Sequence, residues 1–245
     1  MQRIEGQSAF IVHARPYRET SLLIECLTRD HGRVGLIARG VRRERTRLPR
    51  GLLQPLQALR IDWIARGELG TLTAVEPAAA PARYVGEPLL AAMYVNELVL
   101  RLVGRGDPHA TAFERYADCL RRLTTAEPVA WTLRRFERDL LSDLGYALVL
   151  TTSGGAGAPI DAQADYAYDP EAGPRPWRGE TGGLRVGGGS LLALAQDRLP
   201  DAEGLEQLRR LMRRVIRHHL GGASLHAWGM TLAGIQSSSR PIAEQ

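Results

Sequence analysis

The chain has 245 residues, of which 44% are hydrophobic and 24% charged, a composition typical of a soluble globular protein. All 32 basic side chains are arginines, and without lysine the chain cannot use a lysine Schiff base, an adenylated lysine or a phosphate loop ending in Gly-Lys-Ser/Thr. The formal charge is +5, and because residues 1–80 hold 13 arginines against 8 acidic residues, we expect this third of the chain to face a polyanion.

Two properties of the whole chain bear on its location and its metal chemistry. No stretch approaches the roughly 20 apolar residues of a membrane span, and residues 1–10 lack the pattern of a signal peptide, so we expect a cytoplasmic protein. The two cysteines, Cys26 and Cys119, cannot form a four-cysteine zinc site, and we expect both to be buried, inert thiols.

The first 80 residues predict β-structure, because short runs of apolar and β-branched residues alternate with turn residues. The expected strands are 8–15, 20–28, 32–38, 52–65 and 71–76. Five short strands predict a small barrel, and the OB-fold has that number of strands. An SH3-like barrel is the alternative that this pattern leaves open.

A strongly basic segment lies between the third and fourth of these strands. We call residues 39–50 the arginine arm; its arginines are Arg39, Arg42, Arg43, Arg45, Arg47 and Arg50. One glutamate offsets these six positive charges, so the arm repels itself unless an anion compensates it. We predict that it binds nucleic-acid phosphate, with a solvated charged loop as the alternative. Few aromatic residues accompany it in this region, so base stacking stays open.

After the Pro/Ala-rich residues 77–81, apolar side chains recur at helical spacing. The expected helices are 88–103, 108–123, 128–145, 191–196 and 201–220. The Gly/Pro-rich segment 146–190 predicts an irregular inserted module with short strands near 166–168 and 183–186. We therefore predict a barrel domain 1–80 and a helical domain 81–245, whose tail after residue 234 is disordered.

Two features near the end of the chain could bind anions. The glycines 187–189 resemble a phosphate-cradling turn, but no long apolar strand precedes them, so we favour a flexible linker, with Ser190 as the N-cap of helix 191–196. Helix 201–220 is amphipathic, and its arginines are either a second anion surface or a solvated face. These arginines are Arg209, Arg210, Arg213, Arg214 and Arg217.

Metal chemistry is the main alternative in the helical part. His218, His219 and His226 have no carboxylate or cysteine at ligand spacing, so we expect no metal there. Asp139 and Asp143 share a helix face, as the carboxylates of a metal-dependent nuclease could. Because Arg135 lies four residues before Asp139, an ion pair is favoured. A non-DNA interaction scaffold is a third possibility for the chain.

Several short motifs, in the right order over about 220 residues, resemble the RecO family of DNA-repair proteins. In the first domain these are residues 9–22 (AFIVHARPYRETSL), Gly32-Arg-Val, Ala38-Arg-Gly-Val-Arg-Arg43 and Leu53-Gln-Pro-Leu56. In the second they are Tyr94-Val-Asn-Glu-Leu98, Leu133-Arg-Arg-Phe-Glu137, Leu144-Gly-Tyr146 and Leu220-Gly-Gly222. Each motif is short, but their combination is specific.

The resemblance implies an α+β protein with an N-terminal five-stranded OB-fold and a helical C-terminal domain. It implies a recombination mediator that binds single- and double-stranded DNA and anneals strands without cofactor or catalysis. Its partners would be RecR, the single-stranded-DNA-binding protein SSB and, indirectly, RecA, which places it at the nucleoid. Some relatives carry a four-cysteine zinc site after the Leu-Gly-Tyr motif; here residues 151–160 have no cysteine, so we expect a degenerate, metal-free module.

The resemblance also implies a site for the acidic C-terminal tail of SSB. Carboxylates and a terminal aromatic residue need arginine beside an apolar groove. The candidates on the second and third expected helices are Arg134, Arg121, Arg122, Arg135 and Trp131. Arg134 is the first choice, because it lies in the family-like Leu-Arg-Arg-Phe stretch. The alternative is that these arginines pair with Asp118, Glu137 or Asp139.

Overall fold

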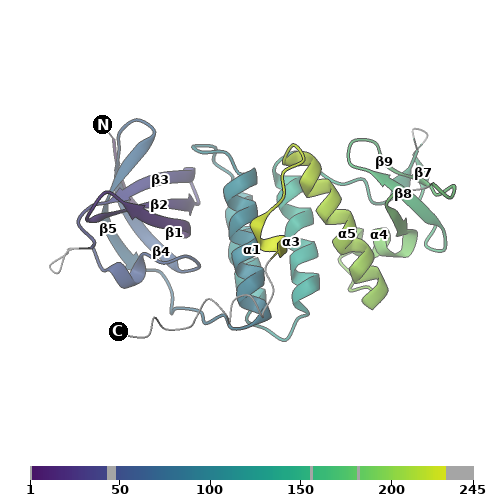
Figure 1. Cartoon of the computed structure of the whole chain (residues 1–245), viewed down its shortest axis with the longest axis horizontal. Coiled ribbons are helices and arrows are strands. Elements are labelled where there is room, and N and C mark those ends of the chain that lie inside the picture. Colours follow the sequence, from purple (N-terminus) through teal and green to yellow (C-terminus); the bar gives the residue numbers. More distant parts are fainter. Residues whose placement is uncertain (1, 43–47, 155–156, 181–182, 230–245) are drawn as a thin grey trace, which may run out of the picture. The chain divides into compact units, whose positions relative to one another are not determined.

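The computed structural model describes residues 2–42, 48–154, 157–180 and 183–229. They form two compact units. Unit 1 comprises Met1–Thr125 and Leu225–Gln245, and unit 2 comprises Ala126–Ser224 (Figure 1). The domain boundary predicted near residue 80 stays a prediction, because the strands and the first two helices share unit 1. The predicted disorder after residue 234 concerns residues outside the described part of the chain. No helix among the described residues is long and apolar enough to cross a membrane.

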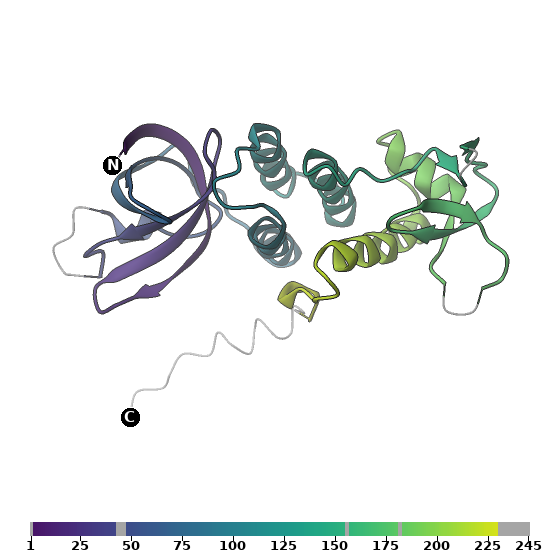
Figure 2. The same cartoon turned by 90° about the horizontal axis from the view of Figure 1, so that it is seen from above.

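The five strands of unit 1 close into a barrel in the order β1-β2-β3-β5-β4. They are β1 (Gln2–Tyr17), β2 (Ser21–Thr28), β3 (Gly32–Ala38), β4 (Ala58–Ala65) and β5 (Leu69–Pro77). Neighbouring strands are antiparallel except β3 and β5, which pair in parallel over Gly35–Ile37 and Leu69–Thr71. β1 pairs with both β2 and β4, with register shifts that bend it (Figure 2). A strand-rich N-terminal part followed by a helical part is thereby confirmed.

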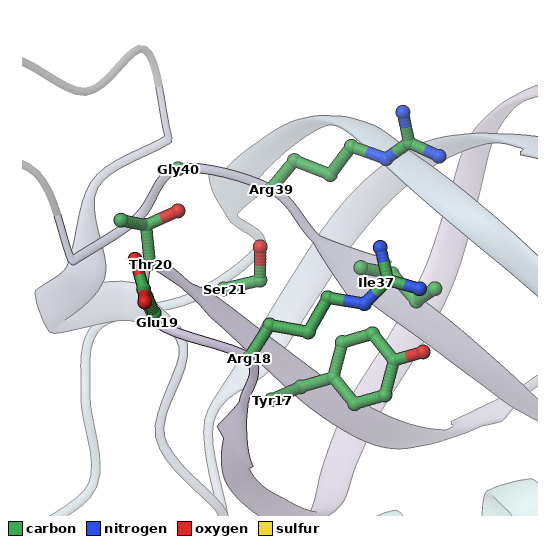
Figure 3. A pocket seen from close by; sticks show the side chains of 8 residues that line it. All are labelled: Tyr17, Arg18, Glu19, Thr20, Ser21, Ile37, Arg39 and Gly40. Atoms are coloured by element: carbon green, nitrogen blue, oxygen red, sulfur yellow. The ribbon is translucent and has the colours of Figure 1, made fainter.

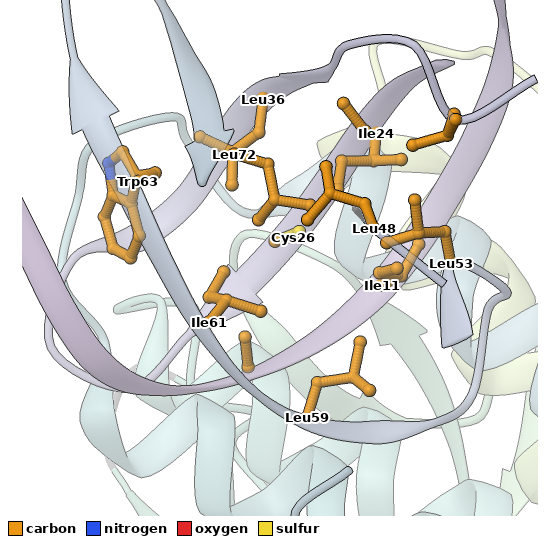
Figure 4. Packing of buried hydrophobic residues seen from close by; sticks show 13 residues of the cluster. Ile11, Ile24, Cys26, Leu36, Leu48, Leu53, Leu59, Ile61, Trp63 and Leu72 are labelled. Atoms are coloured by element: carbon orange, nitrogen blue, oxygen red, sulfur yellow. The ribbon is translucent and has the colours of Figure 1, made fainter. Parts of the chain in front are cut away.

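The barrel closes around apolar side chains that each strand turns inward. Ile11, Ile24, Leu36, Ile61 and Leu72 come from the five different strands and are at most 3% exposed (Figure 4). Because side chains alternate along a strand, every second residue can enter this core. Burial of this apolar surface is the main force that closes the barrel.

The structure corrects the prediction of one long strand over 52–65. Residues Arg50–Leu52 form a 3-10 helix, Leu56 has φ 72°, and β4 begins only at Ala58. A left-handed residue cannot continue a strand, and Pro55 before it has no N–H for a ladder. Leu53 nevertheless joins the barrel core at 3% exposure. The apolar residues at the start of 52–65 therefore indicate burial in the core, not an extended strand.

Three helical segments complete unit 1: α1 (Glu87–Leu102), α2 (Ala110–Arg122) and the short 3-10 helix η2 (His226–Gly229). Phe113 and Tyr116 of α2 pack on Phe10 of β1 with ring centroids 5.4 and 5.0 Å apart. The Glu97 carboxylate on α1 accepts hydrogen bonds from the His226 and Ala227 amides, each 2.8 Å long. The last described segment of the chain thus folds back onto α1.

A buried carboxylate joins the barrel to the turn after α1. The Glu25 side chain is 8% exposed, accepts a 2.8 Å hydrogen bond from Arg33, and pairs with Arg105 through both of its oxygens. Arg33 also donates to the Val103 carbonyl at 2.9 Å, and the Gly106 amide donates to the Arg33 carbonyl at 2.9 Å. At Gly32 (φ 63°) a Cβ would lie 2.0 Å from the carbonyl oxygen of Asp107, so only glycine fits there.

Unit 2 packs helices against small strands. Its helices are α3 (Val129–Asp143), α4 (Gly188–Ala195) and α5 (Ala202–His219). β8 (Asp165–Asp169) lies between β10 (Arg185–Gly187) and β9 (Gly173–Pro176), and β6 (Thr152–Ser153) pairs with β7 (Ala158–Pro159). The Asp201 side chain caps α5 by accepting from the Gly204 amide at 2.8 Å. The predicted irregular module is therefore ordered over its described residues, with a strand at 173–176 that the sequence did not indicate.

The glycines 187–189 are neither a linker nor a phosphate cradle. They end β10 and begin α4, and the amides of Gly188 and Gly189 donate to the carbonyls of Ala164 and Ala162 at 2.8 and 3.0 Å. The Gly187 amide donates to Gln207 at 2.8 Å, so none of the three amides is left for an anion. Ser190 is inside α4 rather than its N-cap, because these contacts start the helix at Gly188.

We predict that Glu25→Ala lowers the free energy of unfolding by about 3–5 kcal/mol, because it leaves Arg33 facing the interior without its counter-ion. Urea denaturation with purified protein measures this change. Glu76→Ala is the matched control, because Glu76 is exposed and contacts Arg60 only at 3.8 Å, so its effect should stay below about 1 kcal/mol. A Glu25→Ala protein as stable as the control would contradict the structural role of this carboxylate.

Candidate nucleic-acid interface

The arginine arm is anchored to the barrel at both described ends. Val41 and Leu48 are 2% and 6% exposed and belong to the barrel core. Between them, the Arg42 amide donates to the Thr20 carbonyl at 3.0 Å, which ties the arm to the β1–β2 turn. Core packing therefore holds the two described ends of the arm on the barrel.

Three of the six predicted phosphate-binding residues can be placed. Arg39, Arg42 and Arg50 are exposed. Arg43, Arg45 and Arg47 lie outside the described residues. Within the described part of the chain, neither Arg39 nor Arg42 forms an ion pair, so their charges are available to an anion. All six residues stay predicted contacts.

A hollow of about 810 Å³ opens between the β1–β2 turn and the end of β3 (Figure 3). It is lined by Tyr17, Arg18, Glu19, Thr20, Ser21, Ile37, Arg39 and Gly40. The hollow adjoins the start of the arginine arm, because Arg39 and Gly40 belong to both. A phosphate and an attached nucleoside could therefore contact the hollow and the arm together.

Arg18 gives this hollow a flat cationic wall. Its guanidinium carbon lies 5.3 Å from the centroid of the Tyr17 ring, the distance of a cation–π contact. Arg18 has φ 53°, a left-handed conformation that the tight turn between β1 and β2 imposes. The sequence analysis did not select Arg18. The available signal was an arginine placed in a turn directly after an aromatic residue.

The predicted residues of the SSB-tail site fall into two sets. On α2, Arg121 and Arg122 both pair with Asp118, with the Arg122–Asp118 contact at 2.5 Å. Although partial burial raises it, hydrogen bonds from Arg122 and Arg121 hold the pKa of Asp118 below its usual value. These residues belong to unit 1, whereas Trp131, Arg134 and Arg135 belong to unit 2.

On α3 the arginines already have carboxylate partners. The Arg134 side chain is 6% exposed and donates to the buried Glu137 at 2.6 Å, while Trp131 is 3% exposed. Arg135 donates to Glu127 at 2.9 Å and to Asp197 at 2.5 Å. Arg134 is thus a member of a buried ion pair, not the surface arginine that the sequence suggested, because its neighbours on the helix face the core of unit 2. Arg135, at 19% side-chain exposure, is the more accessible of the two.

Asp139, one of the two carboxylates of the nuclease alternative, is held by an ion pair instead. Asp139 pairs with Arg138 at 2.7 Å, and Arg138 reaches the Leu194 carbonyl and Asp197. The predicted Arg135–Asp139 pair is wrong, because Arg135 turns to Glu127 and Asp197. Among the described residues, no three or more His, Cys, Asp or Glu side chains lie together as a metal would need.

Two of the three histidines of the metal hypothesis contact other side chains. His219 stacks on Tyr146 with ring centroids 4.2 Å apart, and His218 lies 3.3 Å from Glu171. Burial, followed by the neighbouring His218, lowers the pKa of His219. His226 is in unit 1, with its amide on Glu97. The described residues of 146–190 offer no cysteine, so they do not fit a zinc ion of the type found in some relatives.

The arginines of α5 are partly compensated. Arg209 makes a bidentate contact with Glu206 at 2.6 and 2.7 Å, and Arg210 lies 4.0 Å from the same carboxylate. Arg217 donates to the Gly222 carbonyl at 3.1 Å. Arg213 and Arg214 complete this face. Hydrogen bonds from the backbone amides of Ala172 and Glu171 lower the pKa of Asp169, and the charge of Arg214 adds a smaller effect in the same direction. A second anion surface on this helix stays a prediction.

Comparison with known proteins identifies the family. The profile "Recombination protein O N terminal" matches residues 1–81, and "Recombination protein O C terminal" matches residues 83–228. The chain belongs to the RecO family. Relatives that carry the RecO name match the chain over nearly their whole length. The "DNA repair protein RecO" of Stenotrophomonas maltophilia (strain R551-3) is 46% identical over 230 residues, which cover 93% of this chain and 96% of the relative. The protein of that name from Xylella fastidiosa (strain M12) is 44% identical over 242 residues, covering 97% and 99%.

Both cysteines of this RecO-family chain are buried and outside any disulfide, as the sequence predicted. Burial, followed by the charge of Glu25, raises the pKa of the Cys26 thiol, which disfavours the thiolate that metals and oxidants require. We therefore predict that elemental analysis of the purified protein finds no stoichiometric zinc. A value of about one zinc per chain that survives dialysis against a chelator would contradict this.

Proposed function

We propose that this RecO-family chain is a DNA-repair and recombination mediator that anneals complementary strands without catalysing a covalent reaction. The observation that carries the proposal is a set of arginines at one end of the barrel that have no carboxylate partner among the described residues. Arg18, Arg39 and Arg42 are exposed there, while Arg134, Arg135 and Arg138 of unit 2 are ion-paired. Unpaired arginines bind backbone phosphates with little loss of internal pairing.

We also propose that the barrel is an OB-fold. The support is the strand order β1-β2-β3-β5-β4, and the position of the hollow at the β1–β2 turn. In OB-folds, the β1–β2 loop is one of the loops that contact oligonucleotides. The small strands of residues 152–187 are then a degenerate, metal-free counterpart of the zinc-finger module of some relatives.

Annealing needs no nucleophile or acid–base pair. Two strands repel each other through their phosphates, and a basic surface that screens and briefly holds both backbones lowers that barrier. The expected setting is SSB-coated single-stranded DNA at the nucleoid in the cytoplasm. There the chain would act with RecR and help to load RecA. An annealing assay on bare and SSB-coated complementary strands, without nucleotide, tests this role directly.

Replacing Arg42, Arg43, Arg45 and Arg47 by alanine should weaken binding to single-stranded DNA and leave the fold intact. If all six arginines of the arm contact phosphates, a plot of log K against log salt has a slope of roughly −4. Removing four of them should make this slope shallower by up to about 3. Fluorescence anisotropy over a salt series measures both quantities.

The matched control removes the same charge elsewhere on unit 1. It replaces the exposed Arg3, Arg60, Arg66 and Arg83 by alanine. A smaller effect of this control on affinity supports the arm. Equal losses in the two quadruple variants would show that net charge, rather than the arm, governs binding.

We further propose that α3 contributes to the binding of the SSB tail, with Arg134 and Arg135 as the cationic residues beside Trp131. Because Arg134 is buried against Glu137, it would act by exchanging that partner for a tail carboxylate or by orienting Arg135. Arg121 and Arg122 on α2 are the second set of candidates. This assignment rests on the family and on the chemistry of an acidic tail with an aromatic end.

We expect Arg135→Ala to weaken the binding of an SSB-tail peptide at least about tenfold, as the loss of a charge-assisted hydrogen bond predicts. Annealing of bare DNA should persist while annealing of SSB-coated DNA falls. Arg134 is tested as Arg134→Ala with Glu137→Gln, so that no ionised carboxylate is left buried, and Glu137→Gln alone is its control. Wild-type peptide affinity in both arginine variants would rule out α3.

A further inference from the structure

We infer that the hollow at the β1–β2 turn holds one unpaired base, stacked on the Arg18 guanidinium, and so makes the chain prefer single-stranded over double-stranded DNA. The inference rests on the proposed DNA-binding function and specifies its substrate. It goes beyond phosphate binding, because phosphates are common to both forms of DNA. Only a strand with free base faces could fill such a site.

The aromatic residues of the barrel leave one place for stacking. Trp63 is 2% exposed within the barrel core, and Phe10 is 8% exposed against Phe113 and Tyr116. Tyr17 is only partly buried and lies at the wall of the hollow. Among the described residues of the barrel, its ring is therefore the aromatic surface that a ligand could use.

Arg18 covers this ring and extends its stacking surface. The Arg18 guanidinium carbon lies 5.3 Å from the ring centroid, and because Arg18 is exposed and lines the hollow, a ligand there can reach the guanidinium group. Bases stack on guanidinium planes as they do on aromatic rings. Figure 3 shows Tyr17 and Arg18 on one side of the hollow, with Arg39 across from them.

The size and polarity of the hollow suit a nucleotide. Its volume of about 810 Å³ lies within the range of sites that take small ligands. Arg39 offers a phosphate-binding guanidinium, and Thr20 and Ser21 offer hydroxyl groups. The Glu19 carboxylate on the same rim repels phosphate but can accept a hydrogen bond from a base amino group. A base toward Arg18 and a phosphate toward Arg39 satisfy these groups together.

Contacts within the fold hold the residues of the hollow in place in the absence of DNA. Ile37 on β3 contributes the apolar wall, and Ser21 is 9% exposed at the start of β2. The bond from the Arg42 amide to the Thr20 carbonyl fixes the turn that carries Arg18. Within the described residues, no carboxylate pairs with Arg18, so a base would not have to displace an internal partner.

The test compares strands that differ only in their bases. The probes are an oligodeoxythymidylate of about 12 nucleotides, an abasic deoxyribose-phosphate strand of the same length, and a duplex. The wild-type chain should bind the thymidylate strand about tenfold more tightly than the abasic one, the effect of one stacked base. A 2-aminopurine base in the strand should lose fluorescence on binding.

Four variants separate stacking from charge. Arg18→Lys keeps the charge and loses the flat face, and Tyr17→Leu removes the ring beneath it. Both should bring the ratio of thymidylate to abasic affinity close to one, while leaving abasic affinity and the salt slope nearly unchanged. Tyr17→Phe keeps the ring and Arg60→Lys changes an arginine on β4; both should behave as wild type.

The outcomes distinguish a failure of the base-stacking site from a failure of the proposed DNA-binding function. Equal wild-type binding of the thymidylate and abasic strands, or an unchanged ratio in Arg18→Lys and Tyr17→Leu, overturns the base-stacking site and leaves the proposed function intact. Failure of the wild-type chain to bind any of the strands at low salt overturns the proposed function and this inference with it.

Discussion

The buried carboxylate of Glu25 is the constraint on which unit 1 depends. A charge that is 8% exposed is costly unless it is fully paired, and here two arginines share it. Arg33 comes from β3 and Arg105 from the turn after α1, so the same carboxylate fixes the β2–β3 hairpin and seats the helices beside it. The hydrogen bond with Glu25 raises the pKa of Arg105.

The arginines serve two purposes, and the presence or absence of an ion pair separates them. In unit 2 and in the Glu25 cluster, arginines neutralise buried or half-buried carboxylates and stabilise the fold. At the β1–β2 turn and the arginine arm, the described arginines have no such partners, and their charge is directed at solvent. With no lysine in the chain, the guanidinium group has to serve both purposes. Net charge alone would not have separated these roles.

The sequence predicted the elements well where local patterning decides them. Runs of apolar and β-branched residues located the strands, and the 3–4 spacing of apolar residues located α5, which Asp201 caps in the structure. It failed where distant residues decide. Leu56 has a left-handed conformation that its own segment does not indicate, and the amides of Gly188 and Gly189 donate to the carbonyls of Ala164 and Ala162, 24 and 27 residues earlier. Asp197, a partner of Arg135, lies 62 residues away in sequence. The hollow beside Arg18 arises from the meeting of two strand ends, which no single segment reveals.

The return of the chain to α1 has a consequence for folding during translation. Unit 1 is discontinuous, because Leu225, 3% exposed, and the segment held by Glu97 follow the 99 residues 126–224. A ribosome adding 5–20 residues per second would emit that insertion in about 5–20 s. During this interval the barrel, α1 and α2 can assemble, while the Glu97 carboxylate on α1 still lacks the His226 and Ala227 amides. The nascent chain therefore passes through an incomplete first unit each time it is made.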